Sequence, residues 1–297
     1  MNKIPVAQTV AESYRFVFGG LGNVIGLIWL PIVILTVGGY FTMVPYFSGM
    51  AGALDSGDVS QQGSLVLRLL AFDIVAIVLL AVIAVAISRE ILNPVRRPSF
   101  LRFALGPAEF RAIGGLIALF FLMIIFVVFL VIVSMVIGFA ANALLPAAGS
   151  KGAAGIGGLV SVLGFFGLVY IMVRLGFLLV PAVAMESGFG LERSWQLTKG
   201  NFWRIFAVLV ATLVPIIIVA ILIDMTVLGP DFLNPHLELA HDQAAQMRHS
   251  AEQMRRMSEH LPLMMGIGFL LAPFSYGMTF APAAFAYRAL TGKAPTP

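Results

Sequence analysis

The sequence contains no cysteine among its 297 residues, and only 11% of its residues are charged. The absence of cysteine excludes disulfides, thiolate metal sites and a cysteine nucleophile, and it leaves the redox compartment undecided. A soluble domain carries roughly 25% charged residues, because it must cover its surface with polar groups. With 60% hydrophobic residues, the composition therefore predicts a polytopic membrane protein.

Catalytic motifs are also missing. The sequence has no Gly-x-Ser-x-Gly elbow, no phosphate-binding loop and no His-Glu-x-x-His pair. We therefore expect neither an enzyme nor a cofactor. The N-terminus shows one lysine followed by polar residues, so we expect no removable signal peptide. The net charge of +4 comes mainly from loop cations, which indicates membrane topology rather than nucleic-acid binding.

Six apolar runs are each long enough to cross roughly 30 Å of hydrocarbon at about 1.5 Å per residue. They predict an all-α, multi-pass membrane domain over residues 1–297, with loops at 45–64 and 145–158. The expected spans are 24–44, 65–88, 112–141, 159–184, 205–228 and 263–290. Most cations near the span ends fall on the side that holds both termini, so we expect a bacterial inner membrane protein with both termini in the cytoplasm.

Residues 2–21 carry apolar side chains three and four positions apart, which predicts a cytoplasmic helix lying among the lipid headgroups. A similar spacing of a large apolar residue and a glycine precedes each odd-numbered span, at Tyr14–Gly19, Leu101–Gly106 and Trp195–Gly200. One interpretation is a threefold repeat of an interfacial helix followed by a helical hairpin. The other is that aromatic residues and glycine are common where any helix enters a membrane.

The segment before the fifth span, residues 194–204, reads SWQLTKGNFWR. It resembles the same segment in a bacterial six-span family related to the membrane domain of glycerophosphoryl diester phosphodiesterases, some members of which stand alone. The resemblance implies a six-span fold. It implies no catalytic residue, because the phosphodiesterase chemistry of those proteins belongs to a separate soluble barrel of roughly 250 residues that has no counterpart here.

The same region predicts an amphipathic segment over 185–204, with Leu191, Trp195, Thr198 and Phe202 on one face. Either it is a plain interface anchor or its cations bind lipid phosphates. The lipid-phosphate candidates are Arg193, Lys199, Arg204, Arg96 and Arg97, and the expected interface anchors are Tyr14, Trp195, Phe202 and Trp203.

Three ionisable residues fall inside expected spans: Asp73, Arg174 and Asp224. A charge in hydrocarbon costs a few kcal/mol, so it needs a partner or a purpose. Asp73 and Arg174 lie at depths that would allow them to pair, either as a site for an anionic headgroup or a relay, or as a structural ion pair. Asp224, near the outer end of its span, is expected to be a solvated interface carboxylate.

The long polar insertion, 229–262, predicts an extracytoplasmic amphipathic helix that starts at Asn234 and ends at Pro262. Methionines on its apolar face suit an adaptable contact, so 236–261 is a candidate surface for a protein partner or a second copy. The insertion holds all four histidines, His236, His241, His249 and His260, which we expect to be solvated rather than to bind metal.

Three functions are compatible with these features of the sequence. The first is transport or lipid handling around a polar intramembrane site that includes Asp73 and Arg174, with membrane lipids as partners. The second is a non-catalytic scaffold or assembly subunit that binds an envelope partner through its outer helix. The third, an intramembrane enzyme, is least favoured.

Overall fold

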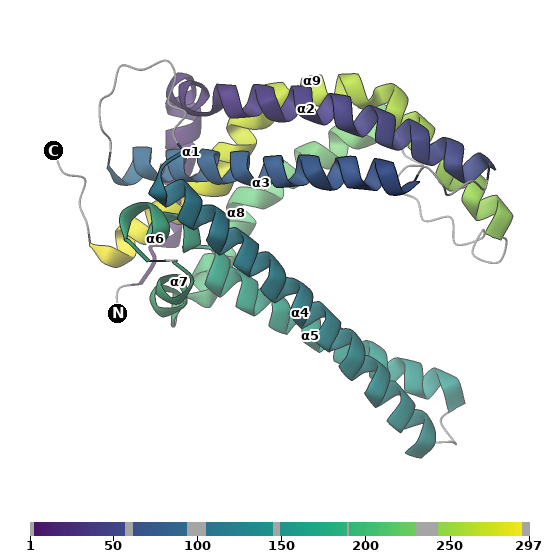
Figure 1. Ribbon diagram of the computed structural model, residues 1–297. Coiled ribbons are helices and arrows are strands. Elements are labelled where there is room, and N and C mark those ends of the chain that lie inside the picture. The colour runs from purple at the N-terminus through teal and green to yellow at the C-terminus, as the bar shows by residue number, and fades with distance from the viewer. Residues whose placement is uncertain are drawn as a thin grey trace.

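The computed structural model describes residues 3–56, 62–93, 105–144, 149–188, 190–229 and 243–292, and all regular structure in these ranges is helical (Figure 1). Six helices are long and apolar enough to cross a membrane, which confirms the all-α, six-helix prediction for a multi-pass membrane protein. The long helices are α2 (Leu21–Ser56), α3 (Gln62–Leu92), α4 (Pro107–Leu144), α5 (Gly149–Gly176), α8 (Phe202–Leu228) and α9 (Gln243–Thr291). The short helices are α1 (Val6–Gly19), α6 (Leu179–Met185) and α7 (Leu191–Thr198).

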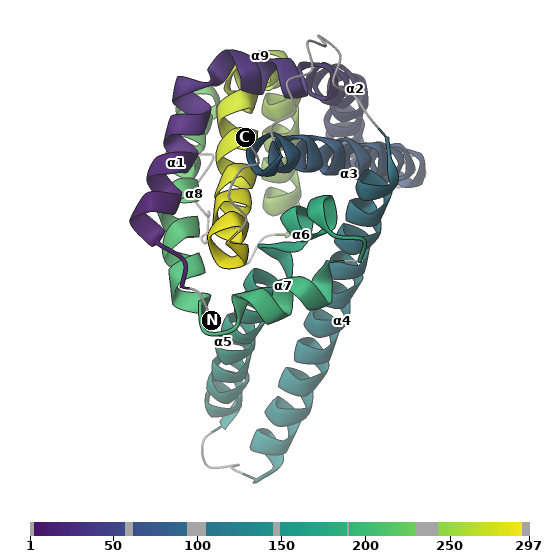
Figure 2. The ribbon, with the colours of Figure 1, turned by 90° about the vertical axis from the view of Figure 1, so that its left-hand side faces the viewer.

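The long helices diverge from one end of the molecule (Figure 1). That end holds both chain termini and the short helices α1, α6 and α7, and we call it the terminus-bearing end (Figure 2). From it, α2, α3 and α9 extend side by side as one arm, and the α4–α5 hairpin extends as a second arm in a different direction. Helix α8 leaves the same end close to α5 and runs toward α9.

The buried core lies at the terminus-bearing end, where the two arms meet. Ile28 of α2, Ile87 of α3, Ile205 of α8 and Tyr287 of α9 are each 0% exposed and belong to one cluster. A second cluster joins α3 and α6 to the first turns of α4, around Ala112. Side-chain packing therefore fixes the arms to each other at this end.

Helices α4 and α5 form an arm that packs mainly on itself. In the most apolar 18-residue stretch of α4 none of the residues is buried, although its mean hydropathy is 3.6. The seam between the helices includes Ser134 and Ser161, whose hydroxyls lie 3.1 Å apart. Gly164 of α5 lies against Leu130 of α4, and a Cβ added to this glycine would be 2.2 Å from Leu130 Cδ2. Small residues thus allow these two helices to approach each other closely.

We expect Gly164→Ala to destabilise the hairpin by about 1–2 kcal/mol, because Leu130 must leave its position to admit a methyl group. Adding Leu130→Ala should recover most of this loss. Thermal unfolding of the protein in detergent checks both variants. Gly158→Ala on the same helix is the matched control, because a Cβ there meets nothing within 4 Å. Equal effects of the two glycine substitutions would contradict this packing.

Helix α1 packs on the bundle, rather than lying only among lipid headgroups as residues 2–21 were predicted to do. Val17 is 0% exposed and faces Gly277 of α9. The Tyr14 hydroxyl donates a hydrogen bond of 3.1 Å to the Ala211 carbonyl of α8. Glu12 forms an ion pair of 2.6 Å with Arg288 near the end of α9. The buried side of α1 carries Thr9 and Ser13 as well as Val17, so the predicted apolar stripe is only partly right. Its partner is protein, because α1 packs against α8 and α9.

Several predicted helix boundaries are wrong. Helix α2 continues through Pro45 to Ser56, so the first twelve residues of the predicted loop 45–64 are helical. Helix α5 already begins at Gly149, inside the predicted loop 145–158. Helix α9 passes through Pro262 without ending, so the described part of the polar insertion 229–262 is the beginning of the sixth long helix. Proline is tolerated inside these helices because neighbouring helices and solvent satisfy the backbone groups that it frees.

The first and last thirds of the chain share part of the predicted repeat. In the first, α1 ends at Gly19 and is followed by the hairpin of α2 and α3. In the last, α7 ends before Gly200 and is followed by α8 and α9. Residues 101–104 of the middle third lie outside the described residues, so the threefold repeat stays a prediction.

Candidate functional site

A sharp turn at the end of α5 creates the polar part of the terminus-bearing end. The predicted fourth span, 159–184, is not one helix: α5 ends at Gly176, and α6 begins at Leu179. Helix α7 follows after Gly190, whose φ of 80° is readily available only to glycine. The described residues of the predicted amphipathic segment 185–204 consequently include a helix of eight residues, α7, a turn after it, and the first turn of α8. This arrangement packs α7 against the last turn of α5.

Arg174 lies in the last turn of α5 and is 7% exposed. It donates hydrogen bonds through Nη2 to the Trp195 carbonyl at 2.7 Å, through Nη1 to the Tyr170 hydroxyl at 3.1 Å, and through Nε to Thr198 Oγ1 at 3.4 Å. Its guanidinium carbon is 3.6 Å from the centroid of the Trp195 ring. We call Arg174, Tyr170, Ser194, Trp195 and Thr198 the Arg174 cage. A stacked, desolvated cation of this kind contributes about 2 kcal/mol.

The cage also closes the end of α5. The Arg174 carbonyl accepts hydrogen bonds from Ser194 Oγ at 2.8 Å and from Thr198 Oγ1 at 3.2 Å. Ser194 Oγ in turn accepts from the backbone N–H of Leu178 at 3.3 Å. Ser194 and Thr198 are therefore buried, and Thr198 does not lie on a lipid-facing surface as predicted. Side chains of α7 thus satisfy backbone groups that a helix end leaves unpaired.

The predicted Asp73–Arg174 pair is not formed. Asp73 is exposed on α3, and among the described residues it has no hydrogen bond or ion pair. Arg174 is instead satisfied by a carbonyl, two hydroxyls and an aromatic ring. Asp224, near the end of α8, is half-buried and likewise has no partner in the described ranges. The structure therefore does not join the three intramembrane candidates into one polar site.

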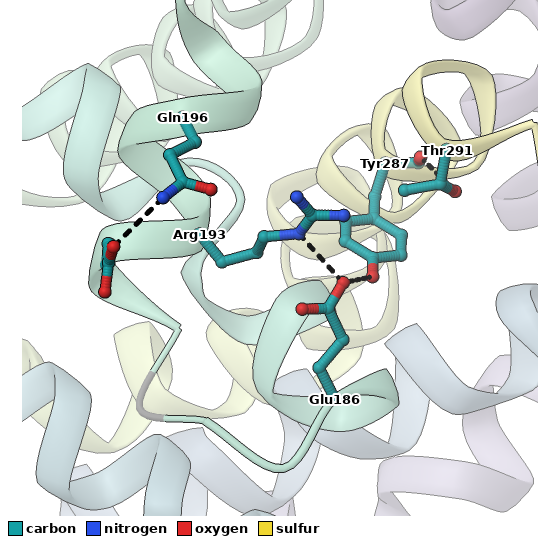
Figure 3. Close-up of polar contacts among 6 residues, drawn as sticks. Glu186, Arg193, Gln196, Tyr287 and Thr291 are labelled. Atoms are coloured by element: carbon teal, nitrogen blue, oxygen red, sulfur yellow. Dashed lines mark hydrogen bonds and ion pairs between the residues drawn. The ribbon is translucent and has the colours of Figure 1, made fainter.

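A second polar cluster links α6, α7 and α9 (Figure 3). Glu186 Oε1 accepts a hydrogen bond from the Tyr287 hydroxyl at 2.6 Å and pairs with Arg193 Nε at 3.0 Å, so both side chains converge on one carboxylate. The Glu186 backbone carbonyl accepts from Arg111 at 3.3 Å. We call these four residues the Glu186 cluster. Arg193 is thus engaged in an internal ion pair, which weighs against its predicted role at a lipid phosphate.

The turn from α7 to α8 gathers cations and the N-terminal residues. Gly200, with a φ of 73°, makes the turn, and Lys199 before it is exposed. The Asn201 side chain accepts a hydrogen bond from the backbone N–H of Ile4 at 3.2 Å. Arg204 donates through Nη1 to the Ile4 carbonyl at 2.9 Å. Because Ile4 is 0% exposed, it holds the neighbouring Lys3 at the same turn as Lys199 and Arg204.

Aromatic rings lie directly beside this turn. The Tyr170 and Phe202 ring centroids are 4.8 Å apart, and those of Phe202 and Trp203 are 5.1 Å apart. Trp203 is 75% exposed and Trp195 is 38% exposed. Both tryptophans have the exposure expected of interface anchors, whereas Phe202 and Tyr14 are half-buried against neighbouring helices.

The remaining predicted candidates lie elsewhere. Arg96, Arg97, His236 and His241 are outside the described residues. His260 contacts the Arg256 carbonyl at 2.9 Å on the exposed part of α9. Within the described ranges, no three histidine or acidic side chains come together in a group able to hold a metal ion.

Sequence reasoning missed the Glu186 cluster and the structural role of Arg174. Glu186 and Tyr287 are separated by 101 positions in the sequence, and no spacing rule connects them. A signal did exist for Arg174. It lies four residues after a tyrosine, a spacing that places both on one face of a helix.

A model of a domain of unknown function, DUF7847, matches residues 103–285. The chain belongs to this family. The region matched to DUF7847 includes the Arg174 cage, all of the Glu186 cluster except Tyr287, and the turn from α7 to α8. It does not include α1, α2 or α3. Comparisons with curated proteins and with solved structures find no match. The resemblance to the membrane domain of glycerophosphoryl diester phosphodiesterases accordingly stays a prediction.

Proposed function

We propose that this protein is a non-catalytic, lipid-handling protein of the bacterial inner membrane, with its terminus-bearing end at the cytoplasmic surface. The observation that carries the proposal is the surface where α5 and α8 separate. There the exposed tryptophans Trp195 and Trp203 lie beside the exposed cation Lys199. Amphiphiles require this combination, because a headgroup needs polar partners at the depth where indole rings lie in a membrane.

Two exposed apolar stripes continue from this surface along the helices. On α5, the side that carries Tyr170 continues as Phe166, Leu163 and Leu159, which are 64%, 70% and 65% exposed. On α8, the side that carries Phe206 continues as Val210 and Ile217, which are 43% and 51% exposed. Since the two helices diverge from the terminus-bearing end, acyl chains are the natural neighbours of both stripes (Figure 1).

Transport of a polar solute receives less support from these contacts. A polar pathway would need charged groups that face one another at membrane depth. Arg174 is enclosed by its cage, and Asp73 lies exposed on a different helix. The scaffold alternative rests on the outer part of α9, where Met247 is 42% exposed. Arg255 pairs there with Asp55 of α2 at 2.6 Å, so part of that surface is already in use.

We expect the protein extracted in mild detergent to retain phospholipid, which native mass spectrometry would count and identify. Phe166→Ala with Phe206→Ala should lower the retained lipid by about a factor of five, because both side chains lose apolar contact with acyl chains. The matched control is Phe120→Ala with Phe139→Ala, which removes two exposed phenylalanines of α4. Equal losses from both pairs, or no lipid retained by the unmodified protein, would refute the proposed function.

A further inference from the structure

Most cations at the terminus-bearing end are already held by protein groups. Arg89 pairs with Glu109 at 2.7 Å, Arg193 pairs with Glu186 at 3.0 Å and Arg288 pairs with Glu12 at 2.6 Å. Three carboxylates of this end, those of Glu12, Glu109 and Glu186, are therefore neutralised by arginines. What the turn from α7 to α8 offers a ligand is positive charge, from Lys199 and Arg204.

Among the described residues, three cations that are unpaired or only partly engaged belong to one turn and the chain segment held against it. Lys3 and Lys199 are exposed and have no acceptor among the described residues. Arg204 gives only Nη1 to the Ile4 carbonyl within the described ranges, which leaves its Nε and Nη2 free for a ligand. The two backbone hydrogen bonds of Ile4, to Asn201 and Arg204, hold the chain at Lys3 against the turn that carries Lys199 and Arg204.

The depth of this turn is marked by its aromatic neighbours. Trp203 immediately precedes Arg204 and is 75% exposed. Indole rings of membrane proteins prefer the level of the lipid headgroups. The exposed stripe of α8 begins at the same residue and continues toward the opposite end of the helix with Phe206 and Val210. A lipid lying along that stripe would therefore place its phosphate at Lys199 and Arg204.

We propose that Lys3, Lys199 and Arg204 form a headgroup site for an anionic phospholipid, with residues 3–5 acting as the strap that completes it. This inference rests on the proposed lipid-handling function and adds the chemical class of the lipid. Arginine supplies directed donors to phosphate oxygens, and the two lysines supply point charges. A zwitterionic lipid gains less, because its amine finds the nearby carboxylates Glu12 and Glu186 already paired.

The test uses the full chain in mild detergent with an equimolar mixture of phosphatidylglycerol and phosphatidylcholine that have identical acyl chains. Native mass spectrometry gives the ratio of the two lipids bound. We expect a ratio well above one for the unmodified protein, and a ratio about tenfold lower for Lys3→Gln with Lys199→Gln. Neither lysine has a protein partner in the described ranges, so both substitutions should leave thermal unfolding unchanged. The charge-matched control, Arg68→Gln with Arg248→Gln, removes two exposed cations far from this turn.

Each outcome separates the inference from the function on which it rests. Lipid bound without anionic preference, or an equal change of the ratio in the control pair, overturns the headgroup site but leaves lipid handling intact. An absence of any bound lipid removes both. Glycerol 3-phosphate added to the mixture tests the source of the phosphate. If it displaces phosphatidylglycerol at equal concentration, the site recognises a soluble phosphate ester and the lipid assignment fails.

Discussion

Arg174→Leu is expected to lower the free energy of unfolding by about 3 kcal/mol or more, the largest loss that we predict for a single side chain. Leucine keeps an apolar side chain in the space but removes every donor of the guanidinium. The Trp195 carbonyl, 2.7 Å from Nη2, loses its charged donor, and the Tyr170 hydroxyl loses its partner at 3.1 Å. The stacking of the guanidinium on the Trp195 ring at 3.6 Å is lost as well.

Thermal or chemical unfolding of the protein in detergent measures this change. Arg174→Lys is the informative comparison, because it keeps the charge and loses the planar fork that reaches three acceptors at once. We expect its stability to lie between those of the leucine variant and the unmodified protein. A leucine variant as stable as the unmodified protein, with altered lipid retention, would instead make Arg174 a ligand-binding residue.

The six long helices could be predicted because lipid imposes a simple rule on sequence. Backbone groups in hydrocarbon must be satisfied within the helix, and the side chains must be apolar over about 20 residues. The most apolar 18-residue stretches of α3 and α4 have mean hydropathies of 3.0 and 3.6, which marks both helices as candidate membrane spans. The pattern of apolar runs along the sequence is therefore enough to predict the number and order of the long helices.

Helix ends were harder to predict, because the signals used in soluble proteins are weaker in a membrane protein. Pro45 and Pro262 both lie within continuous helices, although a proline often ends a helix in a soluble protein. The break that does occur, after Gly176, is not marked by proline. It depends on Ser194 and Thr198, which bind the Arg174 carbonyl from a later segment. Such a tertiary contact has no local signature in the sequence.

The polar site shows the same division between local and tertiary information. A buried arginine was correctly expected to need a partner, but the partner sought was a carboxylate. The structure supplies a backbone carbonyl, two hydroxyls and an aromatic ring. A backbone carbonyl is present at every position, so residue types do not show which one accepts. By contrast, the exposure of Trp203 and Lys199 follows from the local alternation of aromatic and cationic residues, which the sequence displays directly.

Gly190→Ala is expected to have the second largest effect, a loss of about 2–3 kcal/mol in the free energy of unfolding. Two penalties act together at this position. The φ of 80° disfavours any residue with a Cβ. A Cβ built there would also lie 2.8 Å from the Leu179 carbonyl oxygen and 2.5 Å from Val183 Cγ2. Because the carbonyl belongs to the backbone of α6, the strain would have to be relieved by moving α6 and α7 apart.

Two other glycines separate these penalties. Gly200 has a φ of 73° but open space around a Cβ, so Gly200→Ala should carry only the conformational cost of about 1–2 kcal/mol. Gly188 has open space and no positive φ, so Gly188→Ala should be close to neutral. Unfolding measurements on the three variants should therefore rank Gly190→Ala below Gly200→Ala and both below Gly188→Ala. If Gly190→Ala were no worse than Gly200→Ala, the close packing of α7 on α6 would be wrong. The backbone arrangement that places Ser194 and Thr198 beside Arg174 would then be wrong as well.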